Sequence, residues 1–394
     1  MKKILILGAG LWQTPFIQKA KSMGLFVYAT DWDSNPEGKV FANVFEQIDV
    51  RDKNKSLDFA QKHKVDAVFT NSDVGVPTAA YIAEKLSLPF HTQELADIAT
   101  NKYLMRNALK KIGLKTPYYK QCSSLREIED AVSTTDKKLI IKPIDNCGSR
   151  GVFVLSNTDN LKQIADNAFS NSFSGKVLIE ELMLGTESSV EVIVNNGQPY
   201  ILAWCKKQKS DYPYRYDIQL DYFPNRSEEE NEQVSEMVSK LIDGLKIGNG
   251  ILHIEFIWTE EGVKIIEFAL RGCGSNVTTH LLPKLRGFDV MAFLIGKSLG
   301  NSKPQIEFCN NDFGVLKFIV PKSGKIKSIS GLEQIAKLDY IQDFRLDLTA
   351  NSIVDTIKDG RSRPGHYILT APTEKELLAR MQHVEKQLKI EYYA

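Results

Sequence analysis

Strand-like and helix-like segments alternate over the first 95 residues, and this alternation constrains the fold more than any other feature of the chain. Ile4 to Leu7 is an apolar strand, Gly8-Ala9-Gly10 is a turn, and Thr14-Pro15 opens a helix with a capping threonine and an early proline. Further strands follow at Leu25 to Thr30 and Lys64 to Thr70. This order favours a parallel, doubly wound α/β sheet over residues 1–95.

The first turn of this region has part of a dinucleotide-binding fingerprint. Gly8 and Gly10 follow a strand, and Asp31 lies near the position that reads a ribose in such sites. The third glycine position holds Gln13 instead. A related small-molecule site or a purely structural turn is therefore favoured over a dinucleotide site.

Composition narrows the class of protein. A chain of 394 residues is long enough for two to four domains. Its net charge is +1, from 50 basic and 49 acidic residues, so no overall basic field indicates nucleic acid or an acidic membrane as a partner. Five scattered cysteines without a Cys-x-x-Cys pair are typical of a reducing, cytoplasmic location. No apolar stretch approaches the roughly 18 residues that a membrane span needs.

A predicted β-hairpin in the middle of the chain carries two acidic side chains. Ile251 to Trp258 and Val263 to Phe268 are rich in strand-forming residues and flank a turn at Glu260-Glu261-Gly262. Glu255 and Glu267 lie inside these apolar runs, with Arg271 four residues after the second. Carboxylates in such a setting favour a Mg²⁺ site that handles phosphate. The alternative is a pair of solvated glutamates on an edge strand.

A strand–loop–strand segment precedes this hairpin. Ile140-Ile141-Lys142-Pro143 ends in a lysine, and Gly148-Ser149-Arg150-Gly151 follows. A glycine loop allows backbone N–H groups to approach phosphate oxygens, and a phosphate would give Lys142 a partner. The segment lacks the Gly-Lys-Ser/Thr of a P-loop. An ordinary turn with a surface lysine is the alternative.

A third segment combines a strand with an acidic pair. Val177 to Glu181 is followed by Leu182-Met183, and Glu187 comes soon afterwards. Glu180 could accept a hydrogen bond from an adenine amino group, the backbone at Glu181 to Met183 could pair with the ring edge, and Glu187 could hold ribose hydroxyls. Solvated glutamates are the alternative.

Three further local predictions concern helices and loops. One helix is expected from Leu95 to Ile112, with Asn101-Lys102 inside it. Ser227 followed by Glu230 predicts a capping box at the start of a long amphipathic helix. Asp211 to Pro224, which is aromatic and contains proline, is expected to be a loop.

Taken in order, these features resemble the ATP-grasp superfamily over nearly the whole chain. Residues 1–95 look like its pre-ATP-grasp domain, residues 96–300 like the ATP-grasp domain with a lid at about 120–183, and residues 301–394 like a C-terminal accessory region. The resemblance is to carboxylate–amine ligases, such as L-amino acid ligases, phosphoribosylglycinamide-type synthetases and the group like the large subunit of carbamoyl-phosphate synthase. It implies an α/β fold with an α+β grasp core.

The resemblance also implies a role for each matching residue. Lys102 and Lys142 would contact ATP phosphates, and the loop of Gly148, Ser149 and Gly151 would close over them. Adenine and ribose would be held by Glu180, Glu181, Leu182, Met183 and Glu187. Mg²⁺, or alternatively Mn²⁺, would be bound by Glu255 and Glu267, and Arg271 would stabilise an acyl phosphate.

One departure and several weaker candidates accompany these roles. The superfamily often has Asn two residues after the second metal glutamate, where this chain has Ala269, so the number of bound metal ions is open. Gly274, Ser275 and Asn276 could bind a substrate carboxylate or form a tight turn. His253 could touch the substrate or the acyl phosphate, or be a satisfied core histidine. Lys207 could reach the γ-phosphate or the substrate, or be solvated.

The implied reaction joins a small-molecule carboxylate to an amine through an acyl phosphate, with release of ADP and phosphate. An amino-acid-like substrate is preferred. The alternatives are an enzyme that activates bicarbonate, a phosphotransferase, and a non-catalytic ATP-binding protein of the same fold. A homodimer is the default expectation for a soluble enzyme.

Overall fold

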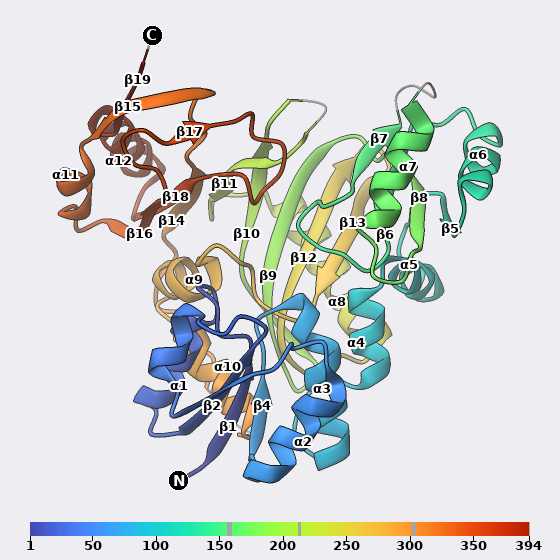
Figure 1. Cartoon of the computed structure of the whole chain (residues 1–394), viewed down its shortest axis with the longest axis horizontal. Helices are drawn as coiled ribbons and strands as arrows, with labels where there is room; N and C mark the ends of the chain where they lie inside the picture. Colours follow the sequence, from blue (N-terminus) through green and yellow to red (C-terminus); the bar gives the residue numbers. More distant parts are fainter. Residues whose placement is uncertain (156–159, 212–213, 302–304, 394) are drawn as a thin grey trace.

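A four-stranded sheet forms the N-terminal part of the computed structural model, which describes residues 1–155, 160–211, 214–301 and 305–393. All its strands are parallel. Their order is β3-β2-β1-β4, with β1 Lys3–Leu7, β2 Phe26–Asp31, β3 Val44–Gln47 and β4 Ala67–Phe69. The predicted parallel α/β sheet is confirmed, and it lies at the lower left of Figure 1.

Helices and short turns connect these strands. They are α1 Thr14–Ser22, η1 Glu37–Phe41, α2 Lys53–His63, η2 Asp73–Gly75 and α3 Val76–Leu86. The N-cap of α1 is Gln13, so the capping role predicted for Thr14 is wrong. The Thr14 hydroxyl instead donates to the carbonyl of Gly10 at 3.1 Å.

The glycine turn after β1 is held by the aspartate at the end of β2. The Asp31 carboxylate accepts the backbone N–H of Ala9 at 2.7 Å and that of Asp33 at 3.0 Å. Gly8 has a φ of +96°, a conformation that glycine adopts without strain. In this structure Asp31 therefore fixes the turn itself.

The region predicted as one helix from Leu95 to Ile112 contains two. They are α4 Gln93–Thr100 and α5 Lys102–Lys111, and Asn101 separates them in an extended conformation. The Asn101 side chain accepts the N–H groups of Tyr103 and Leu104 and so caps α5. Because of this cap, Lys102 stands at the first position of a helix rather than in the middle of one.

A second four-stranded sheet, here called the lid sheet, lies at the upper right of Figure 1. Its strands are antiparallel in the order β5-β8-β6-β7, with β5 Tyr119–Cys122, β6 Leu139–Pro143, β7 Phe153–Leu155 and β8 Val177–Glu181. Helices α6 Leu125–Ser133 and α7 Leu161–Ser170 pack against it through a small core of their own. Ser124 caps α6.

A central sheet of eight strands joins the middle of the chain to its C-terminal region. The order is β13-β12-β9-β10-β11-β14-β18-β16, with β9 Thr186–Asn195, β10 Gln198–Lys209, β11 Asp217–Tyr222, β12 Asn249–Thr259, β13 Gly262–Ala269, β14 Phe313–Phe318, β16 Ile341–Leu346 and β18 Gly365–Ala371. The predicted hairpin of β12 and β13 is confirmed. The prediction of a loop from Asp211 to Pro224 is wrong for β11, which pairs with both β10 and β14.

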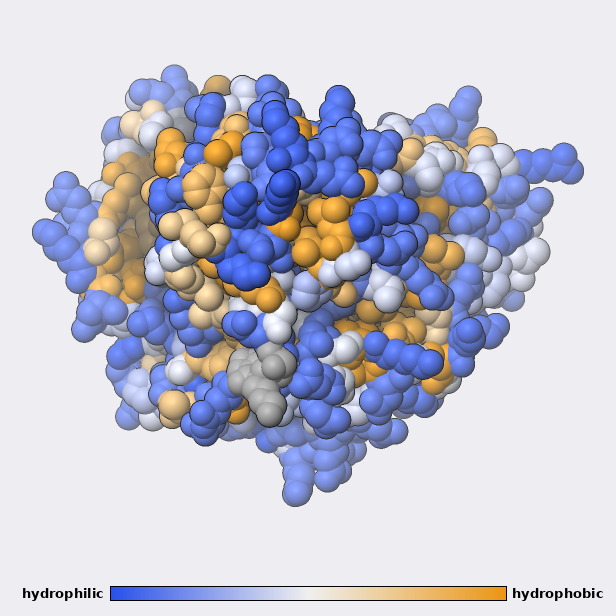
Figure 2. Space-filling model, turned by 90° about the horizontal axis from the view of Figure 1, so that it is seen from below, coloured by the Kyte–Doolittle hydropathy of each residue, from blue (hydrophilic) through white to orange (hydrophobic). Residues whose placement is uncertain are grey.

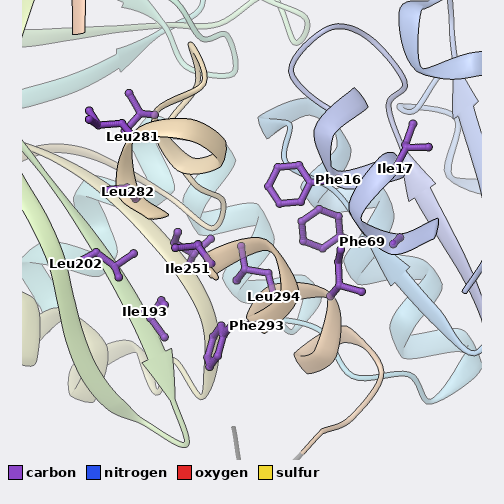
Figure 3. Packing of buried hydrophobic residues seen from close by; sticks show 14 of the residues in the cluster. Phe16, Ile17, Phe69, Ile193, Leu202, Ile251, Leu281, Leu282, Phe293 and Leu294 are labelled. Carbon is purple, nitrogen blue, oxygen red and sulfur yellow. The ribbon is translucent and has the colours of Figure 1, made fainter. Parts of the chain in front are cut away.

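Helices pack on both faces of the central sheet. On one face lies α8 Glu228–Leu245, which begins with the predicted capping box of Ser227 and Glu230, together with α4 and α5. On the other face, η4 Val277–Leu281, α9 Leu282–Arg286 and α10 Val290–Ser298 fill the space between the central and N-terminal sheets. Figure 3 shows Leu294 between Phe16 and Phe69 on one side and Ile251 on the other.

The C-terminal region adds α11 Leu332–Ala336, α12 Glu374–Gln387 and a small sheet of β15 Gly324–Ser330, β17 Ile353–Val354 and β19 Lys389–Tyr392. A core of its own packs α12 on β14 and β18. Seen from below, hydrophobic residues gather in separate patches within a largely hydrophilic surface (Figure 2). Among the described residues, no helix combines the length and apolar character of a membrane span.

His91, in the segment between α3 and α4, leads to a prediction about acid stability. Its ring lies so close to Gly250 that a Cβ there would come within 3.0 Å of Nε2. Burial lowers the pKa of His91 to about 4. An unfolded chain takes up a proton near pH 6.5 and the folded chain only near pH 4, so the imidazole reduces stability as the pH falls between these values, by up to about 3 kcal/mol.

Replacing His91 with glutamine is expected to remove that dependence. Urea unfolding of the two proteins at pH 7.5, 6, 5 and 4 measures it as a difference. The wild type should lose stability relative to His91→Gln as the pH falls. If the free energies of unfolding of the two proteins changed with pH by the same amount, His91 would not be a buried neutral imidazole.

Candidate active site

A cavity between the lid sheet and the β12–β13 hairpin, here called the lid cavity, collects most of the residues singled out in the sequence. Elements far apart in the chain contribute to it, since α5, β6, β8, β12 and β13 all supply lining residues. Those predicted from the sequence are Lys102, Lys142, Gly148, Ser149, Glu180, Glu181, Leu182, Met183, Glu187, Glu255 and Glu267. The arrangement offers several cations and carboxylates around one enclosed volume.

The glycine loop forms one wall of the lid cavity. Gly148, Ser149 and Gly151 have φ values of +69°, +58° and +70°. A Cβ at Gly151 would come within 2.9 Å of both Asn171 and Pro143, so this glycine allows close packing of the loop on the lid sheet. Gly148 has open space around it, which leaves its backbone accessible from the cavity.

Glu255 and Glu267 stand directly opposite each other in the hairpin register. Each carboxylate faces a lysine: Glu255 lies 2.9 Å from Nζ of Lys207, and Glu267 lies 3.3 Å from Nζ of Lys102. Burial would raise the pKa of Glu255, but Lys207 outweighs it and holds the pKa well below the usual range. Two ionised carboxylates on paired strands are a donor set that suits Mg²⁺.

Lys142 already has a protein partner, so the expectation that a phosphate alone would compensate it is wrong. Its ammonium pairs with the carboxylate of Glu180, which also accepts Nε of Arg106 at 2.7 Å. The Glu180 side chain is only 1 % exposed. Burial would raise the pKa of Glu180, but Arg106 and Lys142 outweigh it and lower the pKa. Its carboxylate therefore binds these two cations, while Glu180 also lines the lid cavity, and its contact with an adenine stays a prediction.

This cluster of two cations and one carboxylate retains one excess positive charge beside the lid cavity. We expect Lys142→Met to weaken ATP binding by about 10- to 100-fold, the value of one charge-assisted hydrogen bond. Calorimetric titration of ATP measures the change. Lys137→Met is a suitable control, since Lys137 pairs with Glu181 at 2.6 Å and is 53 % exposed. Equal affinities in both variants would make Lys142 only a structural partner of Glu180.

Arg271 is held by an aspartate from the N-terminal sheet. Its Nε and Nη2 donate to the two carboxylate oxygens of Asp73 at 2.8 and 2.6 Å, and its Nη1 donates to the carbonyl of Gly272. Burial would lower the pKa of Arg271, but Asp73 outweighs it and raises the pKa. The pair thus places a fixed cation at the carboxyl end of β4.

A second cavity, here called the apolar cavity, opens beside this ion pair. Val74, Pro77, Met105 and Phe268 are among its walls, and its polar groups include Asp73 and Arg271. Ala269 also lines it, so the residue that departs from the superfamily pattern adds apolar surface there. Lys102 and Glu267 line both this cavity and the lid cavity. Asn146 and Cys147 also line both, so the two cavities meet at these four residues.

His253 lies between two carboxylates on neighbouring strands. Its Nδ1 is 2.5 Å from Glu191 and its Nε2 is 3.2 Å from Glu255. Burial would lower the pKa of His253, but Glu191 outweighs it and raises the pKa well above the usual value. His253 thereby links the buried Glu191 to a carboxylate of the predicted metal pair, while its ring also lines the apolar cavity.

The residues predicted to bind a substrate carboxylate do not all face the same cavity. Gly274, Ser275, Lys207 and Arg271 line a further cavity next to the hairpin. The amide nitrogen of Asn276 donates to Asp343 of β16 at 2.7 Å, which ties the loop to the C-terminal region. Lys207 is paired with Glu255, so it is not the solvated lysine of the alternative interpretation.

Glu187, predicted to hold ribose, pairs with two cations. Its carboxylate lies 2.5 Å from Nζ of Lys209 and 3.2 Å from Nη2 of Arg215. Asp217 lies 3.4 Å from the same lysine. This network joins β9, β10 and β11 at the far end of the lid cavity.

Sequence reasoning missed Asp73, Arg106 and Glu191. Asp73 follows the carboxyl end of a parallel strand, where ligand-binding side chains gather in such sheets, and this position could have indicated it. Arg106 lies one helical turn after Lys102, and this spacing places both on one face of α5. Glu191 interrupts the apolar run of β9, and its pairing with His253 becomes visible only with the strand register.

The chain matches two family models. Residues 99–275 match the ATP-grasp domain, and residues 317–393 match the L-amino acid ligase C-terminal domain 2. The first range spans the lid sheet, the β12–β13 hairpin and Arg271, and the second covers most of the C-terminal region.

Similar proteins cover most of the chain at low identity. A phosphoribosylamine–glycine ligase of Methanococcus vannielii is 25% identical over 86% of this chain and 83% of its own length. A formate-dependent phosphoribosylglycinamide formyltransferase of Flavobacterium psychrophilum is 23% identical over 87% and 89%. Among solved structures, an L-amino acid ligase from Bacillus licheniformis has a TM-score of 0.83 at 18% identity, with 100% and 99% of the two chains covered.

The fold, the paired glutamates beside a glycine loop and the matched domains define one class. The chain contains an ATP-grasp domain, followed by a C-terminal domain of the L-amino acid ligase type. The curated proteins similar to it include phosphoribosylamine–glycine ligases.

Proposed function

We propose that this protein is an ATP- and Mg²⁺-dependent carboxylate–amine ligase that acts on an amino-acid-like carboxylate. The observation that supports it most is the junction of the two cavities at Lys102 and Glu267, with Arg271 lining the second. A nucleotide in the lid cavity would point its terminal phosphate at this junction. A carboxylate in the apolar cavity would meet it there.

The residues of the lid cavity suit a nucleotide with a divalent cation. Lys102 and Lys142 would neutralise phosphate oxygens, while Leu182 and Met183 would contact the adenine ring. Glu255 and Glu267 would hold Mg²⁺, which supplies charge neutralisation and orientation of the phosphates when bound. In this structure each of the two carboxylates already pairs with the positive charge of a lysine. The same negative charges would compensate a bound Mg²⁺.

The proposed reaction has two steps. A carboxylate oxygen of the substrate attacks the γ-phosphorus of ATP, a new P–O bond forms, the bond to the β-phosphate oxygen breaks, and ADP leaves. The amine then attacks the acyl carbon, the amide bond forms, phosphate leaves, and the amine proton is released. Lys102 and Arg271 would act by positioning and by neutralising the charge on the transferred group.

The apolar cavity supports a substrate with an apolar body. Val74, Met105 and Phe268 offer it apolar surface, and Asp73 provides a carboxylate that could receive an ammonium group. Bicarbonate has no hydrocarbon group that could pack against these apolar walls. This contrast favours an amino acid over bicarbonate, although structures of bicarbonate-binding biotin carboxylase domains share the fold.

The test is release of ADP and phosphate from Mg-ATP with amino acids offered singly and in pairs. Turnover that requires a carboxylate and an amine together, with an amide product seen by mass spectrometry, is the expected result. Turnover that needs bicarbonate would indicate the bicarbonate-activating alternative. Phosphorylation that no amine stimulates would indicate a phosphotransferase, and ATP binding without turnover would indicate a binding protein.

A further inference from the structure

A third cavity lies below the hairpin, on the side of Arg271 away from the lid sheet. It is here called the basal cavity and has a volume of about 560 Å³. Its walls come from the end of β4, the segment between α3 and α4, the turn before β12, and the C-terminal end of α10. This volume lies within the range of sites that bind small organic molecules.

Most of the wall is apolar. Phe90, Leu95, Ile251, Leu270 and Leu294 contribute to it. Their burial against a ligand would be favourable in proportion to the apolar area covered. The walls therefore suit a molecule with a hydrocarbon body.

Lys297 introduces a cation into this apolar setting. The residue is only 9 % exposed, and burial lowers its pKa. In the part of the chain that the structure describes, its Nζ has one recorded contact, with the ring of Phe293 at 5.9 Å, and no carboxylate pairs with it. An exposed lysine would complement the C-terminal end of α10 equally well, so the helix does not account for the burial. Most of the Lys297 side chain is buried, while its ammonium keeps some accessible surface and has no anion from the described residues beside it. An anion bound there would compensate for the water that the ammonium has lost.

His91 adds a neutral polar group to the same wall. It lines the basal cavity and packs on Gly250. A neutral imidazole can donate one hydrogen bond without adding charge. The polar groups that face the cavity thus include one buried cation and one uncharged donor.

We propose that the basal cavity is a second ligand site, which binds a small monocarboxylate with its charge on Lys297 and its hydrocarbon body against the apolar wall. Of the charged residues in this wall, Arg271 is held by Asp73, and Glu94 and Lys246 are exposed, which leaves Lys297 as the largely buried cation. One such charge suits one negative charge rather than the double charge of a phosphate ester.

Among the described residues, the site shares no lining residue with the lid cavity and only Arg271 with the apolar cavity, and it does not depend on the proposed reaction. Leu270 and Arg271 form part of its wall, so an occupant would lie against the residue that Asp73 holds from the other side.

Calorimetric titration with straight-chain carboxylates from butanoate to octanoate, in the presence of saturating Mg-ATP, tests the proposal. Affinity should rise about fourfold for each added methylene group until the cavity is filled. Octylamine, which has the same body and the opposite charge, should bind at least tenfold more weakly than octanoate. Affinities that do not depend on chain length or on charge would overturn the proposal.

Two variants assign the binding to this cavity. Lys297→Met removes the charge and keeps the hydrocarbon stem, and it should weaken octanoate binding at least tenfold. Gly248→Leu should block the cavity, because a Cβ at Gly248 meets no atom within 4 Å and its φ lies outside the left-handed region. Lys284→Met, at an exposed lysine of α9, is the matched control. Unchanged octanoate affinity in either cavity variant would disprove the assignment, and ATP affinity checks that both remain folded.

Discussion

Replacing Glu180 with glutamine is expected to destabilise the protein by about 3–5 kcal/mol, the cost of leaving buried charge without its partner. The substitution keeps the size of the side chain but removes the only carboxylate recorded between Arg106 and Lys142 among the described residues. Arg106 is 1 % exposed and Lys142 8 %, so water cannot replace it. Two buried cations would then face each other without an anion.

Urea unfolding measures this effect, and the neighbouring glutamate provides the control. Glu181→Gln removes a carboxylate that is 29 % exposed and pairs with the surface residue Lys137, so its cost should stay within about 1 kcal/mol. Adding Lys142→Met to Glu180→Gln should restore part of the stability, because it removes one of the two stranded charges. Equal unfolding midpoints for Glu180→Gln and Glu181→Gln would contradict the cluster.

Glu267→Gln is expected to reduce Mg²⁺-dependent turnover by about a thousandfold. This value corresponds to several kcal/mol of transition-state stabilisation from a metal-bound phosphate. The fold should survive, because Glu267 is 34 % exposed and its recorded ion pair is the 3.3 Å contact with Lys102. Initial rates of ADP release at several Mg²⁺ concentrations measure the loss.

A glutamate in the same hairpin serves as its control. Glu261 lies in the turn between β12 and β13, is 71 % exposed, and pairs with Lys264. Glu261→Gln should retain full activity. ATP affinity without Mg²⁺ should be similar in both variants, which separates loss of the metal from loss of the nucleotide. Full turnover in Glu267→Gln would remove this residue from the proposed metal site.

Local signals predicted a large part of the fold. The turn at Glu260 to Gly262 sets the register of the hairpin as far as Phe256, which faces Ile265. A β-bulge between Glu255 and Phe256 then shifts the register by one residue and brings Glu255 opposite Glu267, which the sequence pattern did not indicate.

The capping box at Ser227 is as local a signal as the hairpin turn. The break at Asn101 was missed, because the flanking residues favour helix and only the conformation of Asn101 turns its side chain into a cap.

Interactions between distant segments could not be predicted. Strand β11 ends at Tyr222, two residues before Pro224, and its sequence resembles a loop until β10 and β14 pair with it. Lys142 finds Glu180 because β6 and β8 are neighbours in a particular register. The pair of Asp73 and Arg271 joins residues 198 positions apart, and no local pattern encodes such a distance.

The bond between Asp73 and Arg271 limits how this enzyme could be divided for engineering. A fragment of residues 99–275 would retain the paired glutamates and the glycine loop, but it would lose the anion that fixes Arg271 and the residues of α3 that wall the apolar cavity. The same cut would strip β14 from the edge of β11. The segment that matches the ATP-grasp domain is therefore not a minimal catalyst, and chimeras with related ligases should exchange the N-terminal sheet together with it.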